Sequence, residues 1–310
     1  FGALARPQLK TLVDQLGGLA ARQPVLFFTG FTRAARGAWE DSRLALEEAI
    51  ELARELGDKR RWIEAVCGIS SPLHYQGEYE RRVELGREVL YASARRQGDH
   101  QAEAWGILDQ IESLLALGDR ARLDPLLDEL EPFLKHDIGR SEQVWGHGML
   151  AHGRLLQGRM EAAWESARAT NRAAAGMDPV AVYVYEGHAG AAEALLGLVE
   201  ARWEGAPRVD VQAELDQAIR QLARYSRVFP FAKARQLSCT GRAQLLRGQE
   251  GRALSTLRRA VLEAVRIRMP LEEGIARLSL ARAGGDEAER SRARELFVGL
   301  NAAGWLARAG

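Results

Sequence analysis

Residues 241–264 read GRAQLLRGQEGRALSTLRRAVLEA, a stretch in which a glycine-centred turn separates two segments rich in alanine and leucine. After the turn, Leu254, Leu257, Val261 and Ala264 recur every three or four residues, with polar residues between them. This spacing places the apolar side chains on one face of an α-helix. The stretch therefore predicts two amphipathic helices joined by a tight turn.

The same arrangement recurs along the chain, with a glycine at the turn of each unit. The turn glycines are Gly37, Gly77, Gly118, Gly158 and Gly248. The first four are about 40 residues apart, and the gap before the last suits two further units, the first of them less regular with its turn near 205–207. Self-similarity at such a period indicates stacked helical repeats.

Turn residues mark the ends of the expected helices. Gly-Asp pairs at 57–58, 98–99, 118–119 and 285–286 each place a left-handed helix end before an acidic N-cap. Pro179, Pro230 and Pro270 stand where a first helical residue would be. We predict a leading helix over 7–22 and then seven pairs, at 25–36/38–56, 59–76/78–97, 99–117/119–135, 140–157/159–176, 179–203/208–228, 230–247/249–268 and 270–283/286–300.

Short turns make the two helices of a unit antiparallel, and the sequence lacks the alternating β-branched runs that predict a sheet. We therefore expect one all-α domain over residues 1–310, a right-handed superhelical solenoid of about seven antiparallel helix pairs. Because the chain begins at Phe1, we also expect it to be a fragment of a larger protein.

The glycine spacing resembles that of tetratricopeptide repeats, where small residues flank the turn glycine at fixed distances because the two helices cross closely. One unit matches this pattern at Gly241, Gly248, Ala253 and Ala260. Others depart from it, with Arg82 and Leu123 at the position after the turn where a small residue is expected, and the period exceeds the usual 34 residues. Longer periods also suit HEAT or armadillo units.

The closing segment, residues 293–307, looks like the C-terminal end of bacterial STAND-type signalling ATPases. In that family an N-terminal effector and a nucleotide-binding switch precede a helical-repeat sensor. The resemblance implies that this chain is the sensor arm. The sequence contains no G-x-x-x-x-G-K-[ST] loop, so nucleotide chemistry would lie in another part of such a protein.

The composition argues against several function classes. The 43 basic and 42 acidic residues leave a net charge of +1, which does not favour binding to nucleic acid or to an anionic membrane. Cys67 and Cys239 are far apart and suit buried thiols in a reducing compartment. His147 and His152 are five residues apart and would not share a helix face as metal ligands do. We expect a cytoplasmic protein without a metal, a cofactor or catalytic residues.

In tetratricopeptide solenoids the first helix of each pair lines the concave face, and counting back from the turn glycines assigns residues to it. Aromatic and charged side chains of this kind dominate the energetics of protein interfaces. The candidate partner-binding residues are Glu64, His74, Tyr75, Trp105, Glu112, Trp145, His152, Tyr183, Glu186, Arg235 and Arg242, with Phe27, Phe31, Ser71, Tyr185 and Ser238 on the same face. The alternative is that Trp105 and Trp145 fill gaps between units.

The expected function is that of a non-enzymatic protein–protein interaction or sensor module in signalling, which binds a peptide, a helix or another domain of the same polypeptide in its concave groove. A small-molecule inducer site in the same superhelix is the first alternative, and it would need an enclosed pocket with convergent polar groups. A scaffold or oligomerisation arm with a large apolar patch is the second.

Overall fold

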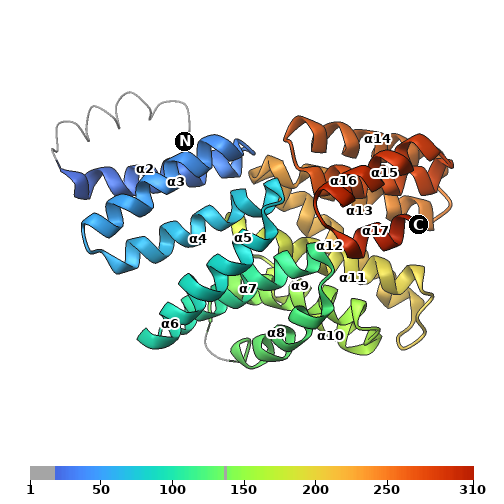
Figure 1. Cartoon of the computed structure of the whole chain (residues 1–310). Coiled ribbons are helices and arrows are strands. Elements are labelled where there is room, and N and C mark those ends of the chain that lie inside the picture. The colour runs from blue at the N-terminus through green and yellow to red at the C-terminus, as the bar shows by residue number, and fades with distance from the viewer. Residues whose placement is uncertain (1–17, 136–137) are drawn as a thin grey trace.

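A computed structural model describes residues 18–135 and 138–310, and this part of the chain consists of helices without any strand (Figure 1). The first helices of the pairs are α2 (Leu19–Ala35), α4 (Lys59–Gln76), α7 (His100–Leu117), α9 (Arg140–Leu156), α11 (Tyr185–Glu200), α13 (Lys233–Leu246) and α15 (Pro270–Gly284). The second helices are α3 (Trp39–Glu55), α5–η1–α6 (Tyr79–Glu84, Leu85–Tyr91, Ala92–Gln97), α8 (Arg120–Phe133), α10 (Met160–Ala174), α12 (Arg208–Val228), α14 (Glu250–Arg266) and α16 (Glu287–Gly299). The predicted all-α solenoid of helix pairs is confirmed.

Local capping chemistry explains where several helices begin and end. Asp58, Asp99 and Asp119 each accept a hydrogen bond from a backbone N–H in the first turn of the helix that follows, at 3.1 Å. The glycines before them have positive φ angles of 67°, 68° and 74°, as the Gly-Asp pairs predict. None of the described helices combines the length and the apolar character that a bilayer crossing requires.

Some predicted boundaries are wrong. The helix expected to begin at residue 25 begins at Leu19 and continues through Pro24 in its second turn. The carbonyl of Ala20, which lacks a donor because Pro24 has no N–H, accepts a hydrogen bond from the Arg61 side chain at 3.0 Å. Pro179 is not a first helical residue, because residues 177–181 are irregular and lead through η2 (Val182–Val184) into a shorter α11. A short helix after α16, α17 (Ala303–Ala309), was not predicted, and the leading helix over 7–22 falls largely outside the described residues.

The first helices of successive pairs pack on one another, most closely where α9 meets α11. A Cβ atom at Gly148 of α9 would overlap the carbonyl of Gly187 on α11, so these backbones approach as only glycine allows. The second helices form an outer layer around the inner one (Figure 1). The main hydrophobic core lies between the two layers.

The row of pairs curves until its two ends meet. The indole N–H of Trp39 on α3 donates to the carbonyl of Ile267 at the end of α14, over 2.7 Å. Helix α15 contacts α4, and the Phe231 ring of η3 (Pro230–Ala232) lies 5.5 Å from the Trp39 ring, measured between centroids. Helix α17 packs on α7, where Gly304 lies against the Gly118 turn. The inner helices α4, α7, α9, α11, α13 and α15 therefore surround a central region that buried side chains fill, and we call this region the lumen.

Candidate functional site

The eleven predicted site residues come from α4, α7, α9, η2, α11 and α13, and none of them is fully exposed. Seven are buried, whereas Glu64, Tyr183, Glu186 and Arg242 are half-buried. The structure brings most of them together in three places. Two are ion-pair clusters inside the lumen, and the third is a pocket at its mouth between α2, α4, α7 and η2.

Arg82 is the centre of the first cluster and is only 2% exposed. Its guanidinium lies 2.5 Å from both the Asp109 and the Glu112 carboxylates and 3.0 Å from Nδ1 of His74. Nε2 of His74 in turn lies 3.6 Å from Glu186. Burial raises the pKa of Glu112 while Arg82 opposes that rise, and burial together with Arg82 lowers the pKa of His74.

Arg235 is the centre of the second cluster. It holds Glu272 in a two-pronged pair at 2.7 and 2.9 Å, and Tyr185 donates to the same carboxylate at 2.7 Å. Arg242 binds Glu193 at 2.6 Å and Glu200 at 2.8 Å. Burial alone would raise the pKa of Glu193, but Arg242 and Arg235 outweigh it and lower this pKa to about 2.

Aromatic rings pack between the two clusters and fill the centre of the lumen. The Tyr75 ring lies 5.8 Å from Tyr185 and 5.2 Å from Phe231, measured between ring centroids. Trp145 is completely buried and donates its indole N–H to Glu112, so it fills space between units as the alternative interpretation proposed. These side chains are buried, so a ligand cannot touch them without displacing packed groups.

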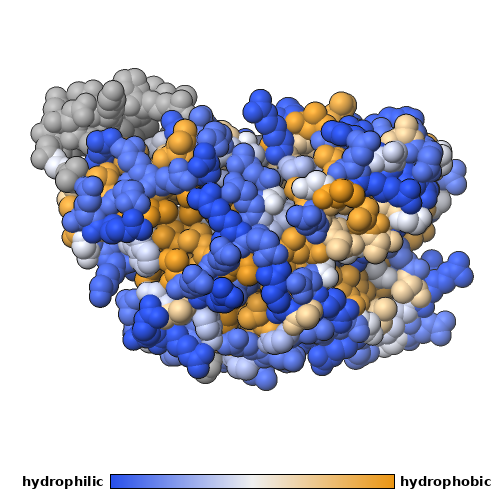
Figure 2. Space-filling model, in the orientation of Figure 1, coloured by the Kyte–Doolittle hydropathy of each residue, from blue (hydrophilic) through white to orange (hydrophobic). Residues whose placement is uncertain are grey.

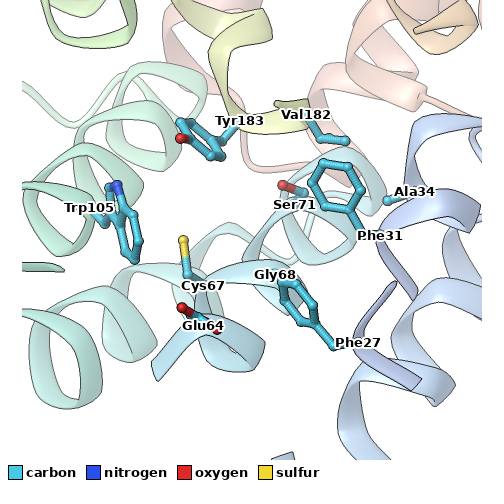
Figure 3. Close-up of a pocket in the computed structure, with 10 residues that line it drawn as sticks. All are labelled: Phe27, Phe31, Ala34, Glu64, Cys67, Gly68, Ser71, Trp105, Val182 and Tyr183. Atoms are coloured by element: carbon cyan, nitrogen blue, oxygen red, sulfur yellow. The ribbon is translucent and has the colours of Figure 1, made fainter. Parts of the chain in front are cut away.

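A cavity of about 90 Å³ opens at the mouth of the lumen (Figure 3). Its lining residues are Phe27, Phe31 and Ala34 of α2, Glu64, Cys67, Gly68 and Ser71 of α4, Trp105 of α7, and Val182 and Tyr183 of η2. Figure 3 shows the aromatic rings and the Cys67 thiol arranged around one open space. Three of the predicted site residues, Glu64, Trp105 and Tyr183, therefore meet in one pocket with Phe27, Phe31 and Ser71 from the same predicted face.

Glu142, in the first turn of α9, ties two walls of this pocket together. One of its carboxylate oxygens accepts hydrogen bonds from the indole N–H of Trp105 at 3.0 Å and the Tyr183 hydroxyl at 3.2 Å. Gln101 donates to the same oxygen at 3.1 Å. Glu142 is 2% exposed, so its carboxylate bonds to these groups and not to water. These hydrogen bonds fix the orientations of the Trp105 and Tyr183 rings.

Sequence reasoning missed Arg82 and Glu142. Arg82 was noted only as a departure from the small residue expected after the turn. That departure was itself the signal, since a large basic residue at a close helix crossing must extend into the interior. Glu142 carried a weaker signal, because Trp and Tyr near a core need acceptors for their polar hydrogens. No local pattern indicated which carboxylate would serve.

A second, wider hollow of about 520 Å³ lies on the surface between α3, α4 and η1. Ile50, Ile69, Leu73 and Leu85 line it, and acidic residues of α3 stand beside them. Figure 2 shows apolar atoms gathered over α4 with hydrophilic atoms around them. The rim acids are already paired, Glu47 with Arg43 at 2.7 Å and Glu51 with Arg54 at 2.7 Å.

The described residues contain no group of three or more His, Cys, Asp and Glu side chains that could hold a metal ion. Burial raises the pKa of the Cys67 and Cys239 thiols, which keeps both protonated at neutral pH. In comparisons with known proteins, no family model matches the chain and no curated protein is similar to it.

Proposed function

We propose that this chain is a non-enzymatic recognition module that binds a segment of a protein partner through the pocket at the mouth of the lumen. The observation that carries the proposal is the cavity walled by Phe27, Phe31, Trp105 and Tyr183. Rigid aromatic walls around a small cavity are typical of the pockets that receive an anchor side chain at a protein interface.

The size of the cavity favours one group over a whole ligand. Pockets for drug-sized molecules measure about 300–1,000 Å³. A cavity of about 90 Å³ is smaller than the roughly 150 Å³ space that holds benzene. It therefore suits one side chain or one end group, with the rest of the partner lying outside on α2 and α4.

The proposed contact with the partner lies at the mouth of the groove and not in its depth. The Arg82 and Arg235 clusters and the rings between them then hold α4, α7 and η2 in place around the pocket. Such support makes the pocket rigid, which lowers the entropy cost of binding. The deeper candidates, among them His152 and Arg242, would act through this support.

The tetratricopeptide-like spacing and the STAND-like closing segment support the proposal that this module belongs to a cytoplasmic signalling protein. There the partner would be another domain of the same polypeptide, and occupancy of the pocket would bias a switch between two states. A small-molecule inducer is the alternative, favoured by the partly enclosed pocket with the Ser71 hydroxyl among its lining. An oligomerisation arm has less support, because exposed apolar side chains such as Val209 and Leu262 lie on different helices.

The test is a selection of short random peptides on the purified chain, followed by affinity measurements on two variants of α2. Phe31→Ala removes a pocket wall, whereas Phe28→Ala removes a neighbouring ring that is 64% exposed and outside the lining. We expect selected peptides to share an anchor residue and to lose about tenfold or more of their affinity with Phe31→Ala only. Peptides that bind both variants like the wild type, or a selection that enriches nothing, would overturn the proposal.

A further inference from the structure

We propose that the group received by this pocket is an organic cation, namely an alkylated ammonium such as a trimethylammonium head. This inference rests on the proposed function and specifies the chemistry of its anchor. The group could belong to a methylated lysine of the partner or to a free quaternary ammonium compound. Both present the same charge, shape and apolar surface to the pocket.

The walls of the pocket are the first reason. Phe27, Phe31, Trp105 and Tyr183 surround the cavity, and the Trp105 and Tyr183 ring centroids are 6.3 Å apart. The face of an aromatic ring carries negative partial charge and attracts a cation within about 6 Å. An alkylated ammonium also tolerates the scarcity of hydrogen-bond acceptors here, because methyl groups cover its charge.

The sign of the surrounding charge is the second reason. No basic side chain is among the lining, and burial raises the pKa of both Cys67 and Tyr183, so these two are neutral at pH 7. The Glu64 carboxylate is paired with Arg60 at 2.8 Å, which leaves Glu142 as the charge to consider. Glu142 lies behind the Trp105 and Tyr183 walls, and in the described residues it has hydrogen-bond donors but no ion-paired arginine, lysine or histidine. Its charge is therefore free to favour a cation in the cavity.

One contact within the chain bears on this assignment. The chain's own Arg60 lies 5.7 Å from the Trp105 ring centroid and pairs with Glu64 at 2.8 Å. The Trp105 ring therefore already attracts one cation, and its neighbour Glu64 carries a charge that Arg60 balances.

The decisive comparison uses choline and 3,3-dimethylbutan-1-ol, which have the same shape but differ in charge. Calorimetry or tryptophan fluorescence on the whole chain would give both affinities. We expect choline to bind about tenfold or more tightly than the neutral alcohol, because the aromatic faces and the carboxylate attract only the charged ligand. A peptide carrying trimethyllysine, compared with the same peptide carrying norleucine, tests the partner-borne source.

Two variants separate the charge from the shape of the pocket. Glu142→Gln keeps an oxygen acceptor for Trp105 and Tyr183 but removes the charge, so it is expected to reduce the choline preference and leave the alcohol unaffected. Glu55→Gln, at an exposed site on α3, is the matched control and is expected to change neither affinity. Circular dichroism establishes that both variants are folded, and Trp105→Leu, which removes a wall, is expected to abolish binding of both probes.

The outcomes distinguish this inference from the proposed function. Equal affinity for choline and the alcohol, or binding of neither by folded protein, overturns the cation assignment. If selected peptides with an uncharged anchor still require Phe31, the recognition function stands without it. If choline binds as expected but no peptide does, the cation assignment stands and the ligand is a free small molecule, which overturns the partner-binding proposal.

Discussion

Arg81 and Arg82 are adjacent in the sequence, yet their surroundings differ completely. Arg81 is on the surface, where its side chain is 53% exposed and pairs with Glu78 at 3.1 Å. Arg82 is enclosed between Asp109 and Glu112 in the lumen. Exposed ion pairs contribute about 0–1 kcal/mol to stability, whereas removing one partner of a buried pair leaves an uncompensated charge. This adjacency offers a matched experiment.

Arg82→Ala is expected to destabilise the chain by about 3–5 kcal/mol, because Asp109 and Glu112 would remain buried without their cation. Arg81→Ala is expected to cost less than about 1 kcal/mol. Urea unfolding followed by circular dichroism measures both. Adding Asp109→Asn and Glu112→Gln to an Arg82→Met variant should recover much of the loss. Equal effects of the two alanine variants would contradict the burial of Arg82.

His188 on α11 gives the clearest pH dependence at this scale. It is 6% exposed and packs against Tyr225, and burial lowers its pKa to about 4 from 6.5. The unfolded chain therefore binds the proton more readily, so the stability that neutral His188 contributes is complete above pH 6.5. About 3 kcal/mol of it is lost as the pH falls from 6.5 to 4.

We expect His188→Gln to flatten the fall in the urea midpoint between pH 6.5 and 4.5, since glutamine does not titrate. Some slope should remain, because burial also lowers the pKa values of His147 and His152 to about 4. Thr170→Val, at a buried side chain that does not titrate, is the control and should keep the wild-type slope. A His188→Gln profile parallel to that of the wild type would refute the assignment.

At the scale of elements, the close packing of α9 on α11 depends on small residues at the crossing. The Gly148 and Gly187 backbones approach so closely that a side chain on either would overlap the other helix. The periodicity of the sequence predicted both helices, but the start of α11 was placed six residues too early, at 179 instead of Tyr185. The prediction relied on Pro179 as a first helical residue, but Val180, Val182 and Val184 have low helix propensity, and the chain reaches α11 through η2.

Gly148→Ala is expected to cost more than about 3 kcal/mol, because its Cβ meets backbone that cannot rotate away as a side chain can. Gly251→Ala in the first turn of α14 is the contrasting variant, since a Cβ there meets open space. It should stabilise the chain by about 0.5–1 kcal/mol through the helix preference of alanine. Thermal unfolding of the two variants measures the difference, and a mild effect of Gly148→Ala would show that the helices can separate.

At the scale of the whole molecule, the contact of the last helices with the early pairs determines the shape. Helix α17 packs on α7, with Gly304 against Gly118, and Leu300 lies against the Gly77 turn. Solenoids are commonly open arrays in which each unit touches only its neighbours. Here the additional contact between distant units closes the lumen and buries the charges inside it.

A comparison of Gly118→Ala with Gly98→Ala separates the effect of the contact between α17 and α7 from the effect of backbone strain. Both glycines end a helix with positive φ, 74° and 68°, so alanine costs each about 1–2 kcal/mol. Only at Gly118 would the new Cβ also push against Gly304. We expect faster amide exchange in α17 and a larger radius of gyration by X-ray scattering for Gly118→Ala alone. Identical exchange in both variants would mean that α17 does not close the molecule.

The sequence by itself determined the helices, their pairing and most of their ends. These features depend on local causes, such as apolar residues every three or four positions and Gly-Asp pairs that end one helix and cap the next. It also placed Phe31, Glu64, Trp105 and Tyr183 on one predicted face, and the structure brings these four together in the pocket.

Only the tertiary structure decided that the row of pairs closes, that Arg82 lies inside and that Glu142 supports the pocket walls. The row closes because small rotations between successive pairs add up, and no single turn sequence determines the total rotation. Which acid meets which base then depends on residues such as Arg235 and Glu272, 37 positions apart. A periodic pattern marks the face on which such residues lie, but their partners are set by the curvature of the whole chain.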